Sequence, residues 1–189
     1  MKNLEGLKNI KTDHQAEVYE TENDSVIKIE KIKKSRVYNE VLKIYEKLIG
    51  MKLKNVVKIL NIESGQGEIK IEMEKLIEPQ FSDLQKRMVA KFADKIEFNQ
   101  YDDFKSAFEA FTTELKEKAR QFEKMPEMKF KQILDILESN KNNIKILGDL
   151  FNGFKELMSL KIYHDDMKPE HLMIDKDNNY KLIDFIRLK

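Results

Sequence analysis

Alternation of apolar and polar residues predicts that the chain begins with β-strands. Residues 7–10, 16–19 and 26–30 are short apolar or alternating runs, and the polar stretches between them are typical of turns. A helix is predicted next, because apolar residues recur at a spacing of three and four after Ser35, a candidate N-cap, and stop at Gly50. This part of the chain therefore predicts a meander of three strands followed by one helix.

Two further strands and a tight turn complete this first region. The strands are predicted at residues 56–62 and 68–73, and the sequence Ser-Gly-Gln-Gly between them is typical of a hairpin. Residues 1–76 thus predict the order β-β-β-α-β-β. The composition changes near residues 76–79, which makes this the candidate boundary between two parts of the chain.

Helical periodicity dominates the chain after Pro79. Apolar residues follow a spacing of three and four through residues 81–161, with interruptions near 99–102 and 125–127. Three or four helices are therefore predicted, the last at about 144–160. Short extended segments follow at 162–164, 172–174 and 180–183. A dense aromatic series, which we expect to be mostly core, consists of Phe98, Tyr101, Phe104, Phe108, Phe111 and Phe122.

Composition and charge narrow the classes of function. The 189 residues suffice for one domain or two small lobes, and a hydrophobic fraction of 41% supports a folded core. Lys and Arg total 35 against 34 Asp and Glu, a balance that argues against a nucleic-acid-binding protein. The absence of cysteine excludes disulfides and zinc–cysteine clusters.

The sequence shows neither a secretory signal nor an apolar run long enough to cross a membrane. We therefore expect a cytoplasmic protein without a membrane partner. A protein secreted as an effector into the cytosol of a host cell would have the same composition.

The segment that carries chemistry lies near the end of the chain. Residues 163–174 read Tyr-His-Asp-Asp-Met-Lys-Pro-Glu-His-Leu-Met-Ile, and residues 181–185 read Lys-Leu-Ile-Asp-Phe. These motifs resemble the catalytic core of the protein-kinase-like superfamily, in which a His-x-Asp loop is followed by Lys and Pro and, after a β-hairpin, by Asp-Phe-Gly. Asp166 and Lys168 match the loop, and Asp184 begins the second motif.

The chemistry of phosphoryl transfer gives each of these residues a role. The reaction needs a carboxylate near the attacking hydroxyl, a cation on the transferred phosphate, and carboxylate oxygens that hold Mg²⁺ between the phosphates. Asp166, Lys168 and Asp184 would supply these groups in that order. The resemblance therefore implies ATP and Mg²⁺, or Mn²⁺, as cofactors.

The resemblance extends to a lysine–glutamate pair in the first part of the chain. In protein kinases a strand lysine that orients the α- and β-phosphates is paired with a glutamate from a helix. Lys28, in the predicted strand 26–30, is the candidate lysine. Glu40 is the expected helix partner because apolar residues of the buried stripe flank it, and Glu46 is the second choice.

Residues 69–76 resemble the last strand of the kinase N-lobe and the hinge that borders the adenine ring. By this resemblance Met73 would be the gatekeeper residue. Backbone groups of Glu74 and Leu76 would bind the edge of adenine.

Three features depart from the family pattern, and two of them concern the phosphates and the metal. The glycines of the phosphate loop are replaced by Lys11, Asp13 and Ala16, and side chains there keep backbone amides farther from a phosphate. His171 replaces the metal-binding asparagine, and imidazole suits Mn²⁺ better than Mg²⁺. His171 would therefore favour Mn²⁺, leave a single metal site at Asp184, mark an inactive protein, or serve as a packing residue.

The sequence after Asp184 lacks an activation segment, since Ile186 replaces the glycine and the chain stops at Lys189. We expect that a protein partner covers this face, or that the chain associates with itself. Residues 80–143 exceed the corresponding segment of ordinary protein kinases and resemble, in length, the extra helices of aminoglycoside and choline kinases.

Together these features predict an α+β, two-lobed protein-kinase-like fold. Residues 1–76 would form a five-stranded antiparallel N-lobe with one helix, and residues 77–189 a reduced, mainly helical C-lobe. The expected function is ATP-dependent phosphotransfer by a protein Ser/Thr kinase that acts on a protein substrate and is activated by a protein partner. The alternatives are an inactive pseudokinase that serves as a scaffold or inhibitor, and a small-molecule kinase related to aminoglycoside and choline kinases.

Overall fold

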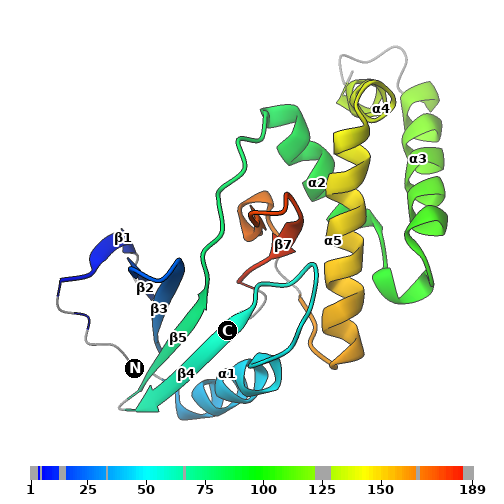
Figure 1. Ribbon diagram of the computed structural model, residues 1–189. Helices are drawn as coiled ribbons and strands as arrows, with labels where there is room; N and C mark the ends of the chain where they lie inside the picture. Colours follow the sequence, from blue (N-terminus) through cyan, green and yellow to red (C-terminus); the bar gives the residue numbers. More distant parts are fainter. Residues whose placement is uncertain are drawn as a thin grey trace.

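An antiparallel sheet and a group of helices make up the molecule, with a small hairpin between them. The computed structural model describes residues 4, 6–12, 16–32, 34–65, 67–121, 129–164 and 167–184. Within these residues the fold is α+β, with a five-stranded antiparallel sheet, a two-stranded hairpin and five α-helices. The sheet and α1 lie at one end of the molecule and α2 to α5 at the other (Figure 1).

The five-stranded sheet has the order β1-β2-β3-β5-β4. Its strands are β1 (Lys8–Thr12), β2 (Ala16–Glu20), β3 (Ser25–Lys31), β4 (Ile59–Gly65) and β5 (Glu68–Glu74). The central strand β3 pairs with β2 on one side and β5 on the other. The predicted five-stranded antiparallel sheet is therefore confirmed, although β4 begins three residues later than the sequence pattern indicates.

Alternation along β3 decides which side chains face the helix α1. Lys28 is paired with Ile71 and Glu30 with Ile69, so these four side chains share one face of the sheet. Ile69 and Ile71 belong to the hydrophobic core, which also includes Tyr45 of α1. Lys28 and Glu30 therefore point to the same side as α1.

The helix α1 (Ser35–Leu48) follows β3 and packs on that face of the sheet. Val41, Tyr45 and Leu48, spaced by three and four residues, are its buried side chains. Lys34, in an extended conformation, is the N-cap, and Ser35 is already the first helical residue. The helix was predicted from its periodicity, but its predicted N-cap is one residue too late.

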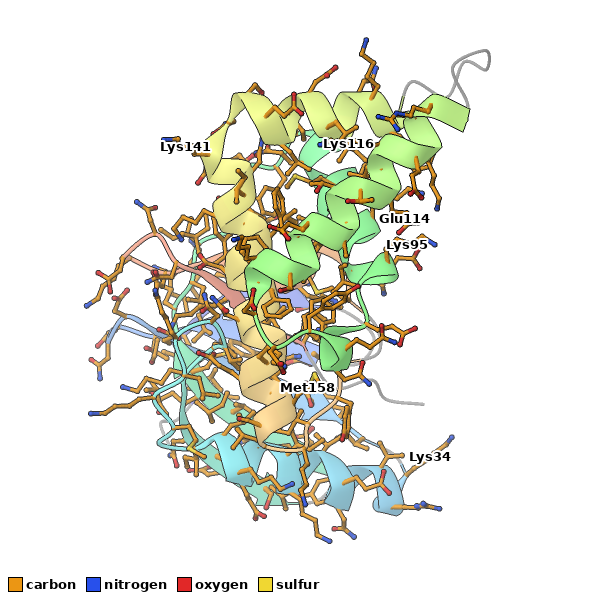
Figure 2. The ribbon with its side chains drawn as sticks, turned by 90° about the vertical axis from the view of Figure 1, so that its right-hand side faces the viewer. Lys34, Lys95, Glu114, Lys116, Lys141 and Met158 are labelled. Atoms are coloured by element: carbon orange, nitrogen blue, oxygen red, sulfur yellow. The ribbon has the colours of Figure 1, made fainter. Side chains whose placement is uncertain are left out.

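Four helices follow: α2 (Asp83–Lys95), α3 (Phe104–Gln121), α4 (Lys129–Ser139) and α5 (Lys141–Ser159). The predicted break near residues 99–102 is confirmed, because a short 3₁₀ helix, η1 (Phe98–Gln100), separates α2 from α3. The other predicted break, at 125–127, lies outside the described residues. Figure 2 shows α3, α4 and α5 from the side, with α1 below them. In the described part of the chain, no helix has the length and apolar content needed to span a bilayer.

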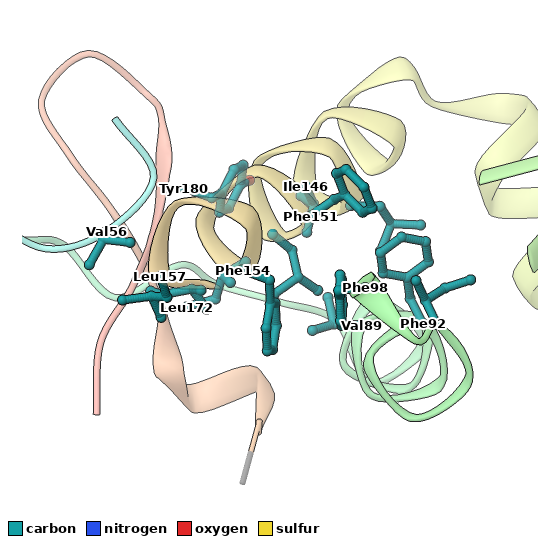
Figure 3. Close-up of a cluster of buried hydrophobic side chains, with 14 of the residues drawn as sticks. Val56, Val89, Phe92, Phe98, Ile146, Phe151, Phe154, Leu157, Leu172 and Tyr180 are labelled. Atoms are coloured by element: carbon teal, nitrogen blue, oxygen red, sulfur yellow. The ribbon is translucent and has the colours of Figure 1, made fainter. Parts of the chain in front are cut away.

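The aromatic series predicted as core does fill the core of the helical part. Phe98 and Phe111 are buried, and Phe92 and Phe98 form an edge contact with ring centroids 6.0 Å apart (Figure 3). Tyr101, Phe104 and Phe108 are partly buried against the same cluster. Phe122, the last member of the series, lies outside the described residues.

A hairpin of β6 (Leu172–Ile174) and β7 (Tyr180–Leu182) lies between the sheet and α5 (Figure 1). A short 3₁₀ helix, η2 (Pro169–His171), leads into it. Of the predicted extended segments, 172–174 and 180–183 correspond to these strands, whereas 162–164 is outside any strand.

Backbone hydrogen bonds tie the hairpin to the sheet part of the molecule. Ile77 and Ile174 exchange both of their N–H···O bonds at 2.8 Å. The N–H of Val57 donates to the Leu182 carbonyl at 3.0 Å, and the N–H of Leu182 donates to the Asn55 carbonyl at 2.9 Å. Residues 55 and 57 thus use backbone groups to bond the hairpin rather than β5, which explains why β4 begins only at Ile59.

Candidate functional site

A cavity of about 410 Å³ lies between the five-stranded sheet and the β6–β7 hairpin, and we refer to it as the cleft. Its lining comes from the five strands of the sheet, α1, the segment after β5, and the hairpin with the 3₁₀ helix that precedes it. Residues singled out from the sequence that line the cleft are Lys28, Met73, Glu74, Leu76, His171 and Asp184. Chain segments as distant as β3 and the end of the described chain therefore contribute to one concave site.

An ion-pair network centred on Lys28 lies in the cleft. The Lys28 ammonium contacts the Glu30 carboxylate at 2.7 Å and also forms an ion pair and hydrogen bond with Asp184. The Tyr45 hydroxyl donates a hydrogen bond to the same Glu30 oxygen at 3.0 Å. The Lys28 side chain is only 15% exposed, so this network is largely shielded from water.

The protonation states of the network follow from burial and pairing. Burial lowers the pKa of Lys28, but interactions with Tyr45, Glu30 and Asp184 outweigh it and raise the pKa well above its ordinary value. Burial raises the pKa of Asp184, but the charge and hydrogen bond of Lys28, with smaller contributions from His171 and Lys11, hold it below its ordinary value. Lys28 is therefore a cation and Asp184 a carboxylate at neutral pH.

Tyr45 is held in the donor state that this network requires. Burial raises the pKa of its hydroxyl well above the ordinary value, and the negative charge of Glu30 raises it further. The hydroxyl therefore stays protonated and can donate to Glu30 at neutral pH.

Glu40, the expected helix partner of Lys28, lies elsewhere. Its carboxylate pairs with Arg36 one turn earlier, at 3.1 Å, and its side chain is 61% exposed. Tyr45 lies five positions after Glu40, which corresponds to a rotation of about 140° around the helix axis. Because Tyr45 faces the network, Glu40 faces away from it, and the second choice, Glu46, is also exposed.

Glu30 and Tyr45 are the network members that the sequence analysis missed. A signal for Glu30 was present, because a residue two positions after a strand lysine points to the same face. The signal for Tyr45 was its place on the apolar stripe of the helix, which reads as ordinary core.

The segment after β5 is held by the side chain of Glu74. One Glu74 oxygen accepts hydrogen bonds from the Lys58 backbone N–H and the Lys181 ammonium, both at 2.7 Å. The Glu74 N–H donates to the Lys58 carbonyl at 3.0 Å. By contrast, the backbone of Leu76 makes no hydrogen bond to any described residue. Leu76 therefore presents a free backbone donor and acceptor beside the cleft, whereas the Glu74 N–H is already used.

The loop predicted to carry the catalytic base is described only in part. Asp166 lies outside the described residues, as does Phe185 of the second motif. Lys168 is exposed, precedes η2 and accepts a hydrogen bond from the His171 N–H at 2.9 Å through its carbonyl. Lys168 is not among the described residues that line the cleft.

The described residues of the cleft suit a metal shared with a ligand better than a metal held by protein alone. Among the described residues, no group of three or more His, Asp or Glu side chains has the geometry of a metal site. Asp184 supplies a carboxylate, and Mg²⁺ commonly binds one or two protein carboxylates together with the oxygens of a phosphate ligand. His171 lines the same cavity and is the second candidate ligand.

The β1–β2 edge of the cleft presents a lysine where a phosphate loop would have glycine. Lys11 and Ile10 line the cleft, and the pairing of β1 with β2 shifts register between Asn9 and Lys11. Asp13 lies outside the described residues, and Ala16 is buried. Lys11 therefore adds positive charge to the cleft.

A scan against models of known protein families found no match to this chain.

Proposed function

We propose that this protein is an ATP-dependent phosphotransferase with a two-lobed protein-kinase-like fold. The observation that carries the proposal is the cleft, which gathers Lys28, Asp184 and the Met73–Leu76 segment from distant parts of the chain. Those residues were chosen from sequence motifs alone. Their convergence on one cavity between a five-stranded sheet and a hairpin supports the N-lobe and C-lobe assignment at residues 1–76 and 77–189.

The residues of the cleft would bind ATP in a defined way. Leu76 would offer its backbone groups to the edge of adenine, and Met73 lines the same cavity. Lys28 and Lys11 bring two positive charges toward the phosphates. The Asp184 carboxylate would hold Mg²⁺ or Mn²⁺, and the metal supplies charge neutralisation of the phosphates when bound.

Transfer requires that Lys28 exchange partners. In the structure, the Lys28 ammonium is paired with both Glu30 and Asp184. When Asp184 binds a metal, Lys28 would keep Glu30 and gain phosphate oxygens. Glu30 thus takes the orienting role that the resemblance assigned to a helix glutamate.

The residues that would act on the phosphate acceptor are assigned from the sequence motif alone. We assign to Asp166 the base that accepts the proton of an attacking hydroxyl, and to Lys168 the cation next to the transferred phosphate. The bond from the hydroxyl oxygen to the γ-phosphorus forms while the bond from that phosphorus to ADP breaks. Serine or threonine of a protein is the proposed acceptor.

Thermal stability in the presence of nucleotide tests the binding step. We expect ATP with Mg²⁺ or Mn²⁺ to raise the melting temperature of the wild type, because a ligand that binds only the folded state stabilises it. Asp184→Ala should lose the metal-dependent part of this rise, and the exposed control Glu109→Gln should keep it. If neither metal–nucleotide pair stabilises the wild type, the proposal is rejected.

Transfer of radiolabelled phosphate tests the chemical step. We expect the wild type to label itself or a generic protein substrate, and Asp166→Ala to bind nucleotide but lose labelling. Equal labelling of the two proteins would reject Asp166 as the base.

A nucleotide-binding scaffold without transfer is the second candidate. The observation that favours it is the position of Lys168, which does not line the cleft within the described residues. Nucleotide-dependent stabilisation of the wild type without any labelling would select this candidate over the enzyme.

A further inference from the structure

A second cavity, of about 580 Å³, lies in the helical part of the molecule and shares no lining residue with the cleft. We refer to it as the distal cavity. Its walls are the end of α2, the short helix η1, the end of α5, and residues 163, 164 and 167. Met158, at the end of α5, is one of its lining residues and is labelled in Figure 2.

The floor of the distal cavity is aromatic. Phe98 and Phe154 line it with their rings stacked, at a centroid distance of 4.0 Å and an interplanar angle of 9°. Both belong to the cluster drawn in Figure 3. Tyr163 also lines the cavity. This residue is 73% exposed, more than any other large hydrophobic residue in the described part of the chain. Aromatic faces on a floor and a rim attract cations as well as apolar groups.

Among the described residues that line the distal cavity, the charged side chains are acidic. Asp94 and Glu97, one before and one after the end of α2, contribute exposed carboxylates. The Lys95 ammonium contacts Asp94 at 3.4 Å, and the Gln100 amide donates a hydrogen bond to Glu97. Within the described part of the chain, neither lysine nor arginine lines this cavity. The cavity thus combines apolar aromatic walls with two negative charges, which complements a positively charged group on an apolar body.

We propose that the distal cavity is a binding site for a small organic cation, an amine or guanidine carried on an apolar or aromatic body. The volume lies in the range of small-molecule sites. The distal cavity shares no described lining residue with the cleft, and the proposal does not depend on the phosphotransferase proposal.

Two histidines provide a reporter for occupancy of this site. His164 lines the distal cavity, with its ring 5.5 Å from that of Phe154. His171 lines the cleft, and its ring is 5.7 Å from that of His164. The chain has three histidines, so their ring signals in NMR spectra can be assigned by single substitutions.

The probes are benzylammonium, benzyl alcohol and benzoate, which share one ring and differ in charge. We expect benzylammonium to bind the full-length wild type saturably, with a dissociation constant of about 1 mM or tighter, and to shift the His164 signals first. Benzyl alcohol should bind about tenfold more weakly, because it lacks the charge that the carboxylates attract. Benzoate should cause no saturable shift. Comparable affinities for the three probes, or no saturable binding of benzylammonium, would overturn the proposal.

Substitutions at exposed positions locate the site without disturbing the core. Asp94→Asn combined with Glu97→Gln should weaken benzylammonium binding about tenfold, and Tyr163→Ser should weaken it further through loss of an aromatic face. Glu109→Gln, an equally exposed carboxylate on α3, should leave binding unchanged. Unaltered binding by the Asp94/Glu97 double variant would show that the cation binds elsewhere and would reject the site.

Discussion

At the scale of single residues, the cleft is organised by one lysine between two carboxylates. Lys28 contacts Glu30 from its own strand and Asp184 from the end of the described chain. Breaking a buried ion pair from one side leaves an uncompensated charge, which costs more free energy than the loss of an exposed pair. Each partner of Lys28 should therefore have a measurable effect on stability even without a ligand.

Substitution of the strand glutamate tests whether it replaces the expected helix glutamate. Glu30→Gln keeps the shape but removes the charge beside Lys28 and should lower the free energy of unfolding by about 1–3 kcal/mol. Glu40→Gln, on the exposed side of α1, should change it by less than about 0.5 kcal/mol. Urea unfolding measures both variants. A larger effect at Glu40 than at Glu30 would contradict the network.

The ion pair of Asp184 predicts a specific dependence on pH. Because the pKa of this carboxyl is below its ordinary value in the folded protein, its contribution to stability is present above about pH 4 and is lost as the pH falls through the folded-state value. The stability difference between the wild type and Asp184→Asn should therefore be constant from pH 7 down to about pH 4 and shrink as the pH falls further. Thermal melts across this range measure it. A difference that stays constant would mean that Asp184 is not charge-paired.

The sequence revealed part of this site for physical reasons that can be stated. Lys28 and Asp184 could be predicted because they stand at positions of motifs that resemble the protein-kinase-like superfamily, and both line the cleft. Glu40 was chosen because its neighbours are apolar, but position on a helix face depends on the rotation per residue rather than on neighbours. Tyr45 was missed because a buried tyrosine on an apolar stripe looks like core until its hydroxyl partner is known.

At the scale of elements, α1 reaches the cleft through a hydroxyl. Tyr45 is 4% exposed and donates to Glu30, which is also buried. The acidic partner of Lys28 lies on β3 itself, so a shift of α1 would remove the tyrosine without separating the lysine from its glutamate. We expect α1 to adjust the strength of the network rather than to form or break it.

Removal of the Tyr45 hydroxyl tests how much the hydrogen bond from α1 contributes to the stability of the network. Tyr45→Phe should lower the free energy of unfolding by about 1–2 kcal/mol, because it leaves a buried carboxylate oxygen with one hydrogen-bond donor fewer. Tyr38→Phe, on the same helix, removes only a long bond of 3.4 Å to the Glu68 carbonyl and should cost clearly less. Chemical denaturation gives the free energy of unfolding of both variants. An equal loss in the two would show that the Tyr45–Glu30 hydrogen bond contributes no more than the long bond of Tyr38.

Most elements could be predicted because their periodicity is local, and the errors occur where pairing is not local. The strands β2, β3 and β5 follow directly from alternation in the sequence. Val56 and Val57 continue an apolar run that predicts a strand together with residues 59–62. In the structure, however, Val56 forms a parallel bridge with Leu182 of the hairpin, and the Val57 N–H donates to the Leu182 carbonyl. No pattern within residues 56–62 indicates that partner.

At the scale of the whole molecule, the sheet and the helices meet where α5 crosses the junction of residues 55–57 with β7. Gly153 of α5 lies at this crossing, and a β-carbon there would be 2.6 Å from the Asn55 carbonyl oxygen and 2.8 Å from a methyl group of Leu182. Glu156, one turn later, accepts hydrogen bonds from the N–H groups of Lys54 and Asn55 at 3.0 and 2.9 Å. The position of α5 relative to the sheet therefore depends on the close approach of its backbone at Gly153 to residue 55 and β7.

Two glycines of α5 give a matched test of this junction. Gly153→Ala should lower the free energy of unfolding by about 1–3 kcal/mol, because the clash outweighs the gain in helix propensity. Gly148→Ala meets only the Phe104 ring at 3.4 Å and should be neutral or stabilising by up to about 1 kcal/mol. Thermal and urea unfolding distinguish the two variants. An unchanged free energy of unfolding for Gly153→Ala would mean that α5 does not contact residue 55 and Leu182 so closely.

The hydrogen bonds between Ile77 and Ile174 have a consequence for the integrity of the molecule. These bonds, with those of Asn55, Val57 and Leu182, join the sheet part to the hairpin independently of the connecting segment 78–82. A single protease cut in that segment would therefore leave two fragments that stay associated and migrate as one particle until they are denatured. Amide hydrogens of Leu182 and Ile174 should then exchange with solvent only when both fragments unfold together.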